Sequence, residues 1–383
     1  MDNTSYIEIS KKAYKSNIKF LKKVVGDNVK ISSVVKGNAY GHGYEQMIPL
    51  AEQNGINHFS VFSAYEAKQV FKYISDTSEI MIFGFINHEQ LEWVIENEIE
   101  FYIYDLAGLE NAGDTAKLLK KKAKIHIELE TGFKRTGIEP EEFDSLILYL
   151  HENADNFVIK GICTHFAGAE SIANYVRVKN QLILFKKYHK YFVKNNIIAE
   201  YLHTSSSSAT LIYPEARFNM VRVGIAQYGF WPTPEVLLLR NNKYGDKESS
   251  LKRVISWKSE IMAIKKISKG EFVGYGNSFQ AAKDMIVAII PVGYNNGYSR
   301  SLSNRGHVLI HGRRADVLGV VTMNTITVNI TDIKNAVNGE EVILIGSHNK
   351  NNITIASFSE MSSYLNYQIL ARLPMNIPRF VIE

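Results

Sequence analysis

Lys36 is the residue of this sequence whose setting most suggests covalent chemistry. It directly follows a short β-branched run at residues 31–35 and precedes a glycine-rich stretch at residues 37–43 that contains Tyr40. An ammonium held against apolar surroundings loses hydration, so its pKa falls and the neutral amine becomes available for Schiff-base chemistry. A lysine that merely extends its amine to solvent would occupy the same position. The glycine-rich turn and Tyr40 favour the reactive lysine.

Other polar side chains follow similar short apolar runs further along the chain. Glu128 and Arg135 lie at and after one such run, His165 ends the next, and Arg222 lies within a later one. Guanidinium groups bind anions, and imidazoles exchange protons near neutral pH. These side chains can act together only if the fold brings the ends of the runs to one place.

The segment from residue 30 to about residue 230 alternates short apolar runs with longer amphipathic stretches, which indicates strand-helix units on a parallel sheet. Eight such units are what a (β/α)8 barrel requires, and its chemistry lies at the C-terminal ends of the strands. Lys36, Glu128, Arg135 and His165 would meet there. The expected strands lie at residues 31–35, 58–62, 80–85, 101–104, 125–129, 158–164, 200–203 and 220–228.

The loops after strands seven and eight of this fold frequently bind a phosphate. Ser206, Ser207, Gly224 and Ile225 fall in these loops and offer hydroxyls and backbone N–H groups. The serines could instead be a simple helix N-cap. We expect a phosphate because a lysine, serines and a glycine converge on one barrel mouth.

From about residue 254 the pattern changes to alternating strands and glycine turns with little helical periodicity. We therefore expect a barrel domain at residues 10–235 and a mostly β domain at residues 245–383, to which the N-terminal strand 1–9 also belongs. The polar stretch 241–250 is the expected linker. Strands of the second domain are expected at residues 286–291, 307–310, 317–321, 325–330, 341–345 and 353–356.

Composition limits the classes of partner. The net charge of +5 is scattered, without a basic tract interleaved with aromatic residues, so nucleic acid is not expected as a partner. The single cysteine, Cys163, excludes an intrachain disulfide and indicates a reducing compartment. No signal-peptide pattern and no bilayer-length apolar stretch is present, so we expect a cytoplasmic protein without a membrane partner.

Residues 35–43, VKGNAYGHG, resemble the pyridoxal 5′-phosphate attachment motif of the alanine racemase family. Further segments resemble the same family in the family's order, at residues 164–167, 218–229, 274–276, 291–294 and 366–370. One such match is weak evidence, whereas several in order across two domains are not coincidence. The resemblance implies pyridoxal-phosphate-dependent racemisation of an amino acid, with L-alanine to D-alanine as the default.

The resemblance also implies two catalytic bases. Lys36 would hold the cofactor and exchange the substrate's α-proton on one face, and Tyr275 would serve the other face. Alone, Tyr275 would more often be a packed turn tyrosine. In this family the tyrosine comes from the β domain of the partner subunit, so the resemblance implies a two-fold symmetric homodimer with shared active sites.

The same resemblance implies contacts to the cofactor and to the substrate. Arg222 would face the pyridine nitrogen, where a permanent cation disfavours ring protonation, and His165 would lie near the ring. The implied phosphate contacts are Tyr40, Ser206, Ser207, Tyr367 and the backbone of Gly224 and Ile225. The implied substrate contacts are Arg135, the backbone N–H of Met323, and Tyr294.

Four positions depart from the family, among them Thr322, which stands where the family has a cysteine. Glu128 stands where many members carry a carbamylated lysine, and we hypothesise that its carboxylate pairs with and orients Arg135. Asn324 replaces an aspartate, and Val320 replaces an arginine, near the family's substrate entrance. These changes leave serine, or a longer or basic amino acid, as alternative substrates.

Other classes of protein remain as alternatives. A fold-related decarboxylase of basic amino acids would normally supply a cysteine from the β domain, whereas Cys163 lies in the expected barrel. A non-enzymatic pyridoxal phosphate carrier built on a lone barrel would lack the second domain and Tyr275. A catalytically inactive relative is disfavoured because both expected bases are present.

Overall fold

The structure, a computed structural model, describes residues 3–354 and 366–383, apart from the side chains of Glu248, Asn366 and Tyr367. The chain divides into two compact units. The barrel unit comprises Ala13–Lys36 and Met47–Lys252, and the β unit comprises Met1–Lys12, Gly37–Gln46 and Arg253–Glu383. Lys36 is therefore the last residue of the barrel unit before a short segment that belongs to the β unit.

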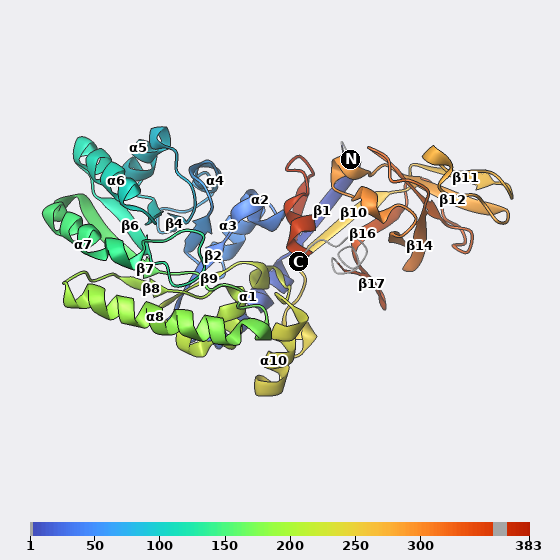
Figure 1. Cartoon of the computed structure of the whole chain (residues 1–383). Coiled ribbons are helices and arrows are strands. Elements are labelled where there is room, and N and C mark those ends of the chain that lie inside the picture. The colour runs from blue at the N-terminus through green and yellow to red at the C-terminus, as the bar shows by residue number, and fades with distance from the viewer. Residues whose placement is uncertain (1–2, 355–365) are drawn as a thin grey trace. The chain divides into compact units, whose positions relative to one another are not determined.

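Eight parallel strands form the barrel unit (Figure 1). They follow the order β8-β7-β6-β5-β4-β3-β2-β9, and each hydrogen-bonded pair is parallel. β8 and β9, at the two ends of this order, are in contact, so the sheet is a near-closed barrel as predicted. The strands are β2 (Lys30–Val34), β3 (His58–Val61), β4 (Glu79–Ile82), β5 (Glu100–Ile103), β6 (Ala123–Glu128), β7 (Phe157–Cys163), β8 (Tyr201–His203) and β9 (Met220–Val223).

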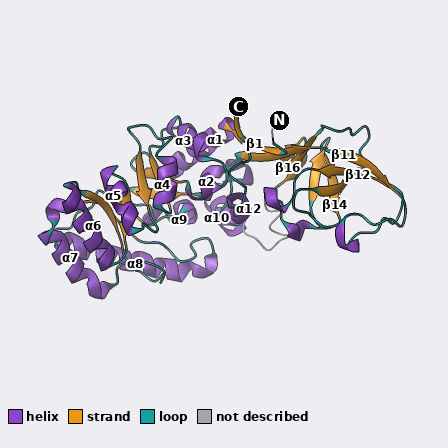
Figure 2. Ribbon diagram, turned by 90° about the horizontal axis from the view of Figure 1, so that it is seen from above, coloured by secondary structure: helices purple, strands orange, loops and turns teal. Residues whose placement is uncertain are grey.

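Helices alternate with these strands and cover the outside of the barrel (Figure 2). Local sequence explains where they begin: the side chains of Ser63 and Asp105 accept hydrogen bonds from the first-turn N–H groups of α4 and α6. The helices are α1 (Lys11–Val25), α3 (Tyr44–Glu52), α4 (Ala64–Val70), α5 (His88–Glu96), α6 (Leu106–Leu119), α7 (Phe143–Glu152), α8 (Tyr175–Lys194), α9 (Ser207–Ile212) and α10 (Pro234–Tyr244).

The interior of the barrel is unusually polar. Barrels of this fold are normally filled by layers of branched apolar side chains. Among the polar or charged strand residues with at most 6% of their surface exposed, seven on six of the strands form one hydrogen-bonded set, namely Ser32, His58, Ser60, Glu100, His126, His203 and Arg222. Each of them is hydrogen-bonded to at least one other member of the set.

Antiparallel strands dominate the β unit. The main sheet has the order β11-β12-β15-β14-β13-β16-β10-β1-β18, with β17 paired to β16. β1 lies between β10, to which it is antiparallel, and β18, to which it is parallel. The elements are β1 (Ser5–Ser10), β10 (Ile255–Glu260), β11 (Ala263–Ile267), β12 (Met285–Ile290), β13 (His307–Ile310), β14 (Arg313–Leu318), β15 (Ile326–Asn329), β16 (Glu341–His348), β17 (Asn351–Ile353), β18 (Arg379–Ile382) and helix α12 (Asn366–Ala371).

Several expected elements end elsewhere than predicted, among them the strands at 80–85 and 317–321, which end at Ile82 and Leu318, and two elements differ in kind. The strand expected at residues 220–228 ends at Val223, and Ile225–Tyr228 form a short 3-10 helix. All four of those residues are buried, so their apolar pattern does not separate strand from helix. The expected linker at 241–250 is helical as far as Tyr244, the last residue of α10. Gly245 follows as the C-cap, with φ +69°.

The last expected strand, at residues 353–356, is described only in part. β17 ends at Ile353, and residues 355 and 356 lie outside the described part of the chain.

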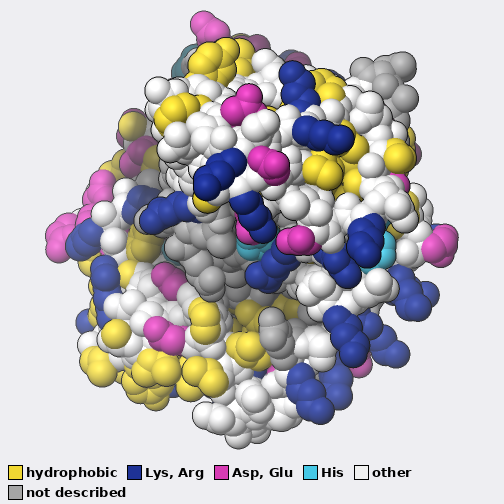
Figure 3. Space-filling view, turned by 90° about the vertical axis from the view of Figure 1, so that its right-hand side faces the viewer, with side chains coloured by type: hydrophobic (Ala, Val, Ile, Leu, Met, Phe, Trp, Pro, Cys, Tyr) yellow, Lys and Arg dark blue, Asp and Glu magenta, His cyan; other side chains and the backbone are white. Residues whose placement is uncertain are grey.

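The surface carries Lys and Arg side chains interspersed with acidic and apolar ones on the face shown in Figure 3. None of the helices in the described part of the chain combines the length and apolar character needed to cross a bilayer. Cys163 is fully buried at the end of β7, and burial raises the pKa of its thiol.

Candidate active site

Lys36 lies at the C-terminal end of β2, directly after Val35, whose N–H donates to the carbonyl of Ser60 on β3. Its Nζ lies 5.5 Å from the centroid of the Phe83 ring. Solvent reaches the side chain, yet the surrounding protein removes enough hydration to lower its pKa, and the nearby Arg135 cation lowers it further. The structure thus gives Lys36 the lowered pKa that a Schiff-base lysine needs.

The chain leaves Lys36 through a left-handed turn. Gly37, Asn38, Ala39 and Tyr40 have φ angles of 62°, 54°, 53° and 52°. For residues other than glycine this conformation costs roughly 1–2 kcal/mol each, and runs of it are rare. Such strain persists only where surrounding contacts hold it in place. The turn carries Tyr40, one of the expected phosphate contacts.

Hydrogen bonds within the β unit hold this turn. Asn38 Oδ1 accepts from the N–H of Tyr44 at 3.1 Å, and the Tyr44 hydroxyl accepts from the N–H of Asn38 at 3.1 Å. The His42 ring bonds through Nδ1 to the carbonyls of Ala39 and Tyr40, both at 3.0 Å. The left-handed turn was not predicted, although the pair Gly37-Asn38 tolerates positive φ better than any other residue types.

Arg222 on β9 uses most of its donors inside the protein. Nη1 donates to the carbonyl of His203 at 3.0 Å and to His203 Nδ1, and Nη2 donates to the carbonyl of Thr164 at 2.9 Å. Nη2 also lies 3.4 Å from Nδ1 of His165. The remaining donor, Nε–H, has no acceptor among the described residues. Arg222 therefore keeps one oriented N–H for an acceptor that the protein does not supply.

His165 is held neutral. Burial lowers its pKa to about 3, and the cations of Arg222, Arg135 and Lys36 contribute to this shift. Its ring meets Phe133 edge-to-face with centroids 5.4 Å apart. A neutral imidazole beside three cations is a suitable neighbour for an uncharged aromatic ring, and it adds no further positive charge to the site.

The expected ion pair between Glu128 and Arg135 is not formed. Glu128 is 4% exposed, and its Oε2 accepts a hydrogen bond of 2.7 Å from the Thr136 hydroxyl. Arg135 instead stacks over Phe133, with its Cζ 4.5 Å from the ring centroid. Burial raises the pKa of Glu128, and Arg222 and Arg135 offset this only in part. On the Phe133 ring the Arg135 guanidinium gains a cation–π contact and keeps its hydration. This explains why Arg135 does not extend to the buried Glu128 carboxylate.

The expected phosphate loops lie at the start of α9 and after β9. Ser206 precedes α9 in the N-cap position, but its side chain caps nothing and makes no hydrogen bond to the described residues. Ser207 Oγ accepts from the N–H of Gly224 at 2.9 Å and from that of Ala226 at 3.4 Å. Ser207 and Gly224 are thus adjacent, and the Gly224–Ile225 segment follows directly at the end of the strand that carries Arg222.

The remaining expected residues belong to the β unit. Tyr275 is 75% exposed and lies between Gly274 and Gly276, whose φ angles are +74° and +71°. Tyr294 and Met323 come from neighbouring loops: the N–H of Tyr294 donates to the carbonyl of Thr322 at 3.0 Å, and that of Asn295 donates to the carbonyl of Met323 at 3.0 Å.

The side chain of Tyr367 lies outside the described part of the structure.

The two units match one family in succession. Residues 9–232 match the N-terminal domain of alanine racemases, and residues 254–381 match their C-terminal domain. The chain belongs to the alanine racemase family. The resemblance found in the sequence is thereby confirmed.

Curated relatives in the alanine racemase family match this chain along its length. The alanine racemase of Leptospira interrogans is 31% identical over 389 residues, which cover 99% of this chain and 96% of the relative. That of Clostridium novyi is 32% identical over 380 residues, covering 99% and 95%.

Solved structures agree with these sequence matches. The alanine racemase of Clostridium difficile has a TM-score of 0.91 at 26% identity, covering 100% of this chain and 96% of that one. The alanine racemase of Bartonella henselae, solved with covalently bound pyridoxal phosphate, has a TM-score of 0.84 at 26% identity and covers 99% of this chain and 100% of that one.

In this member of the alanine racemase family, sequence reasoning missed the neighbours that set the chemistry of the expected residues. Phe83 beside Lys36, Phe133 beneath Arg135, and Thr136 at Glu128 were not anticipated. Phe133 and Thr136 lie within three residues of Arg135, so proximity along the chain was an available signal. Phe83 follows a different strand, and only the closed barrel brings it to Lys36.

Proposed function

We propose that this protein interconverts L- and D-alanine with pyridoxal 5′-phosphate as cofactor. The observation that carries the proposal is Arg222, a buried cation with four N–H groups bonded to the protein and one left for an outside acceptor. An unprotonated pyridine nitrogen is such an acceptor, because a guanidinium has no lone pair and can only donate. The family match over both units and the lowered pKa of Lys36 support the same function.

The described residues fit the cofactor at three points. Lys36 offers an amine of lowered pKa for the covalent bond, and Arg222 offers Nε–H for the ring nitrogen. Ser206, with its uncommitted hydroxyl, the hydroxyl proton of Ser207 and the backbone N–H of Ile225 offer donors for the phosphate, and the N–H of Gly224, which donates to Ser207 Oγ, would be shared with it. Tyr40 and Tyr367 complete the proposed phosphate contacts from the β unit.

When bound, pyridoxal phosphate withdraws electrons from the substrate's α-carbon and so makes its proton acidic. Lys36 Nζ takes or returns that proton on one face, and the Tyr275 hydroxyl does so on the other. His165, held neutral, leaves Arg222 as the charged neighbour of the ring. Because Arg222 cannot give up a proton, it would disfavour protonation of the ring nitrogen and so favour simple proton return over side reactions.

We assign the substrate contacts to Arg135, the backbone of Met323, and Tyr294. Arg135 binds the carboxylate, Met323 offers its N–H, and Tyr294 limits the size of the side chain. Glu128 acts on Arg135 as a nearby negative charge and as the partner of Thr136. Alanine is favoured over serine or a longer or basic amino acid because Tyr294 narrows the site.

We propose that the working protein is a cytoplasmic homodimer. Tyr275 lies on an exposed loop and makes no hydrogen bond to the described residues, although the reaction requires it beside a cofactor-bound lysine. A two-fold dimer that places this loop over the partner's Lys36 would meet that requirement twice.

Incubation of the purified protein and pyridoxal phosphate with L-alanine in deuterium oxide tests this function. We expect D-alanine that carries deuterium at Cα, detected by chiral chromatography with mass spectrometry. Lys36→Ala should abolish both the product and the covalent cofactor absorbance. Racemisation of another amino acid alone would reassign the substrate, and carbon dioxide release without racemisation would identify a decarboxylase.

A further inference from the structure

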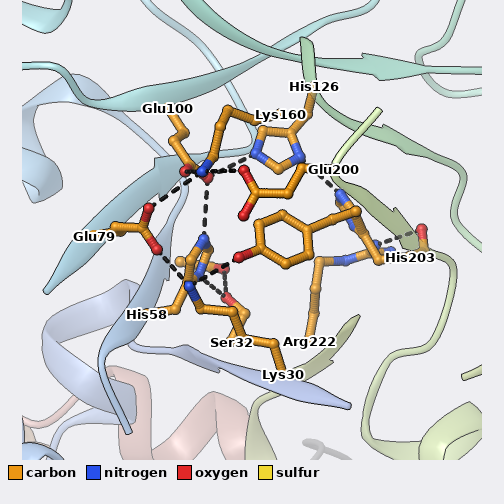
Figure 4. Close-up of polar contacts among 12 residues, drawn as sticks. Lys30, Ser32, His58, Glu79, Glu100, His126, Lys160, Glu200, His203 and Arg222 are labelled. Carbon is orange, nitrogen blue, oxygen red and sulfur yellow. Dashed lines mark hydrogen bonds and ion pairs between the residues drawn. The ribbon is translucent and has the colours of Figure 1, made fainter. Parts of the chain in front are cut away.

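A continuous chain of buried hydrogen bonds runs through the barrel from Arg222 to Glu100 (Figure 4). His203 on β8 bonds to Arg222 through Nδ1, and its Nε2 lies 2.8 Å from Nδ1 of His126 on β6. His126 Nε2 lies 2.7 Å from Oε2 of Glu100 on β5. Both imidazoles are fully buried, and Glu100 is 1% exposed. The chain therefore joins the cofactor side of the barrel to a carboxylate that the proposed reaction does not use.

Arg222 alone fixes the direction of every bond in this chain. A guanidinium only donates, so Nδ1 of His203 must accept, and the proton of a neutral His203 lies on Nε2. Nε2 then donates to Nδ1 of His126, which places the proton of a neutral His126 on its own Nε2. That proton points at Glu100. No other arrangement of two neutral imidazoles leaves all the contacts paired.

Glu100 requires the same direction from the opposite end. Burial raises its pKa, but hydrogen bonds from His126 and His58 outweigh this and hold the pKa well below its usual range, so the group is a carboxylate. Burial also lowers the pKa of His126 and of His203, which keeps both rings neutral. A carboxylate only accepts, so His126 Nε2 must carry the proton. The two ends agree on one set of tautomers.

The carboxylate has a second branch that leads away from Arg222. His58 Nε2 lies 3.0 Å from the same Oε2, and its Nδ1 lies 2.8 Å from the hydroxyl of Ser32. The other oxygen, Oε1, lies 3.3 Å from Nζ of Lys160, which also pairs with Glu79 and Glu200 at 3.3 and 2.6 Å. Lys160 lies among these three carboxylates, so an ion pair holds Glu100 on the side opposite to His126.

We propose that Glu100 is the anionic anchor of a one-directional relay, through His126 and His203, that positions Arg222 for the cofactor ring. The relay keeps His203 in the tautomer that accepts from Arg222, which holds the guanidinium with Nε–H free. This inference rests on the proposed function. Filling the barrel with apolar side chains would be at least as stable as burying these charges, so stability does not account for the network.

The tautomers can be measured in the wild-type protein without cofactor. Nitrogen-15 NMR of labelled histidine separates protonated from bare ring nitrogens. We expect His203 and His126 to be protonated at Nε2 and bare at Nδ1. A protonated Nδ1 in either ring would overturn the proposal whether or not the protein racemises alanine, so its failure is distinguishable from failure of the proposed function.

Glu100→Gln and His58→Gln form a matched pair of variants in the loaded protein. Both change a buried partner of the network, but only Glu100→Gln removes the anion at the end of the Arg222 branch. We expect Glu100→Gln to shift the nitrogen-15 signal of labelled pyridoxal phosphate and to lower kcat about 10-fold with little change in KM, as outer partners of a site typically do.

His58→Gln should leave the cofactor signal in place and lower kcat less than about three-fold, on the scale of a neutral hydrogen bond changed outside the relay. Equal shifts of the cofactor signal in both variants would show a general effect of packing and overturn the relay. If Glu100→Gln does not fold, His126→Gln interrupts the same branch one residue nearer to Arg222, and an unmoved cofactor signal in that variant would overturn the relay.

Discussion

At the scale of single residues, Arg222 and Glu128 are both buried charges, but their surroundings differ. Arg222 is bonded through both terminal nitrogens to carbonyls and an imidazole, whereas the Glu128 carboxylate is bonded to one hydroxyl. The Arg222 guanidinium therefore has hydrogen-bond partners in the interior, whereas burial raises the pKa of Glu128 and works against its charge. The cost of an underbonded carboxylate indicates that Glu128 is kept for its charge near Arg135.

Glu128→Gln should separate this electrostatic role from stability. Folding raises the pKa of this carboxyl group, so the group stabilises the folded protein only while it is protonated. That contribution is complete below the pKa of the unfolded chain and is lost as the pH rises through the higher pKa of the folded protein. At neutral pH the glutamine, which can still accept from Thr136, should leave the free energy of unfolding unchanged or higher. We expect kcat to fall about 10-fold, or roughly 1.4 kcal/mol of transition-state stabilisation.

Denaturant unfolding and steady-state kinetics check this, with the exposed Glu152→Gln as control. Full activity in Glu128→Gln would remove Glu128 from the substrate site.

Tyr275→Phe should give a different outcome for the two enantiomers of alanine. Removing a general base costs about 10²–10⁴-fold in rate, so racemisation should fall by roughly 10³. Lys36 still reaches one face, so one enantiomer should keep exchanging its α-hydrogen with deuterium oxide while the other does not. Proton NMR of each enantiomer measures this, and equal exchange of both would mean that Tyr275 is not a base.

Much of the candidate site could be predicted from the sequence, because Arg222 lies on a strand and Lys36, His165 and Ser207 follow the ends of strands within four residues. What each side chain touches could not. Whether Arg135 contacts Glu128 or the Phe133 ring depends on how deeply the carboxylate is buried. The strand pattern of the sequence does not indicate the burial of a single side chain.

At the scale of elements, the left-handed turn after Lys36 depends on a close approach of two backbones. Gly41 has φ +79°, and a Cβ at this position would overlap the carbonyl oxygen of Leu370 in α12. A glycine-rich sequence predicts a turn, but the hand of the turn and its contact with a helix more than 300 residues away come from tertiary structure.

Gly41→Ala should therefore cost more than backbone strain alone. Gly26 has a similar φ of +84°, and a methyl group added there would meet no atom within 4 Å, so Gly26→Ala isolates the strain, about 1 kcal/mol. We expect Gly41→Ala to lower the free energy of unfolding at least twice as much as Gly26→Ala does, measured by thermal or denaturant unfolding. We also expect it to weaken cofactor affinity, because the same turn carries Tyr40. Equal losses in the two variants would show that the contact with Leu370 yields easily.

At the scale of the whole molecule, the barrel and the mostly β region were predictable because each strand has its own apolar run and turn. The polar interior was not. His58, Glu100 and His126 each lie at or near the start of a separate expected strand, and no local pattern indicates that they meet. These residues meet only because strands far apart in the sequence pair in the barrel, and no single segment of the sequence indicates that pairing.

Mixed subunits test the proposed shared sites. Lys36→Ala and Tyr275→Phe each inactivate both sites of their own homodimer. In a heterodimer of the two, one site would regain both bases and the other would lack both. We expect mixing and reassembly at equal amounts to restore up to about a quarter of wild-type activity, because half the dimers are mixed and each holds one intact site. No recovery with confirmed subunit exchange would mean that each subunit supplies its own tyrosine.

Cys163 gives the molecule a practical property. Its thiol is fully buried and has a raised pKa, and alkylating reagents attack the thiolate. The chain has no other cysteine, so the native protein presents no sulfhydryl to such reagents. A cysteine introduced at an exposed position such as Leu118 would be the sole reactive thiol, and a fluorophore or spin label could be attached there without first removing a native residue.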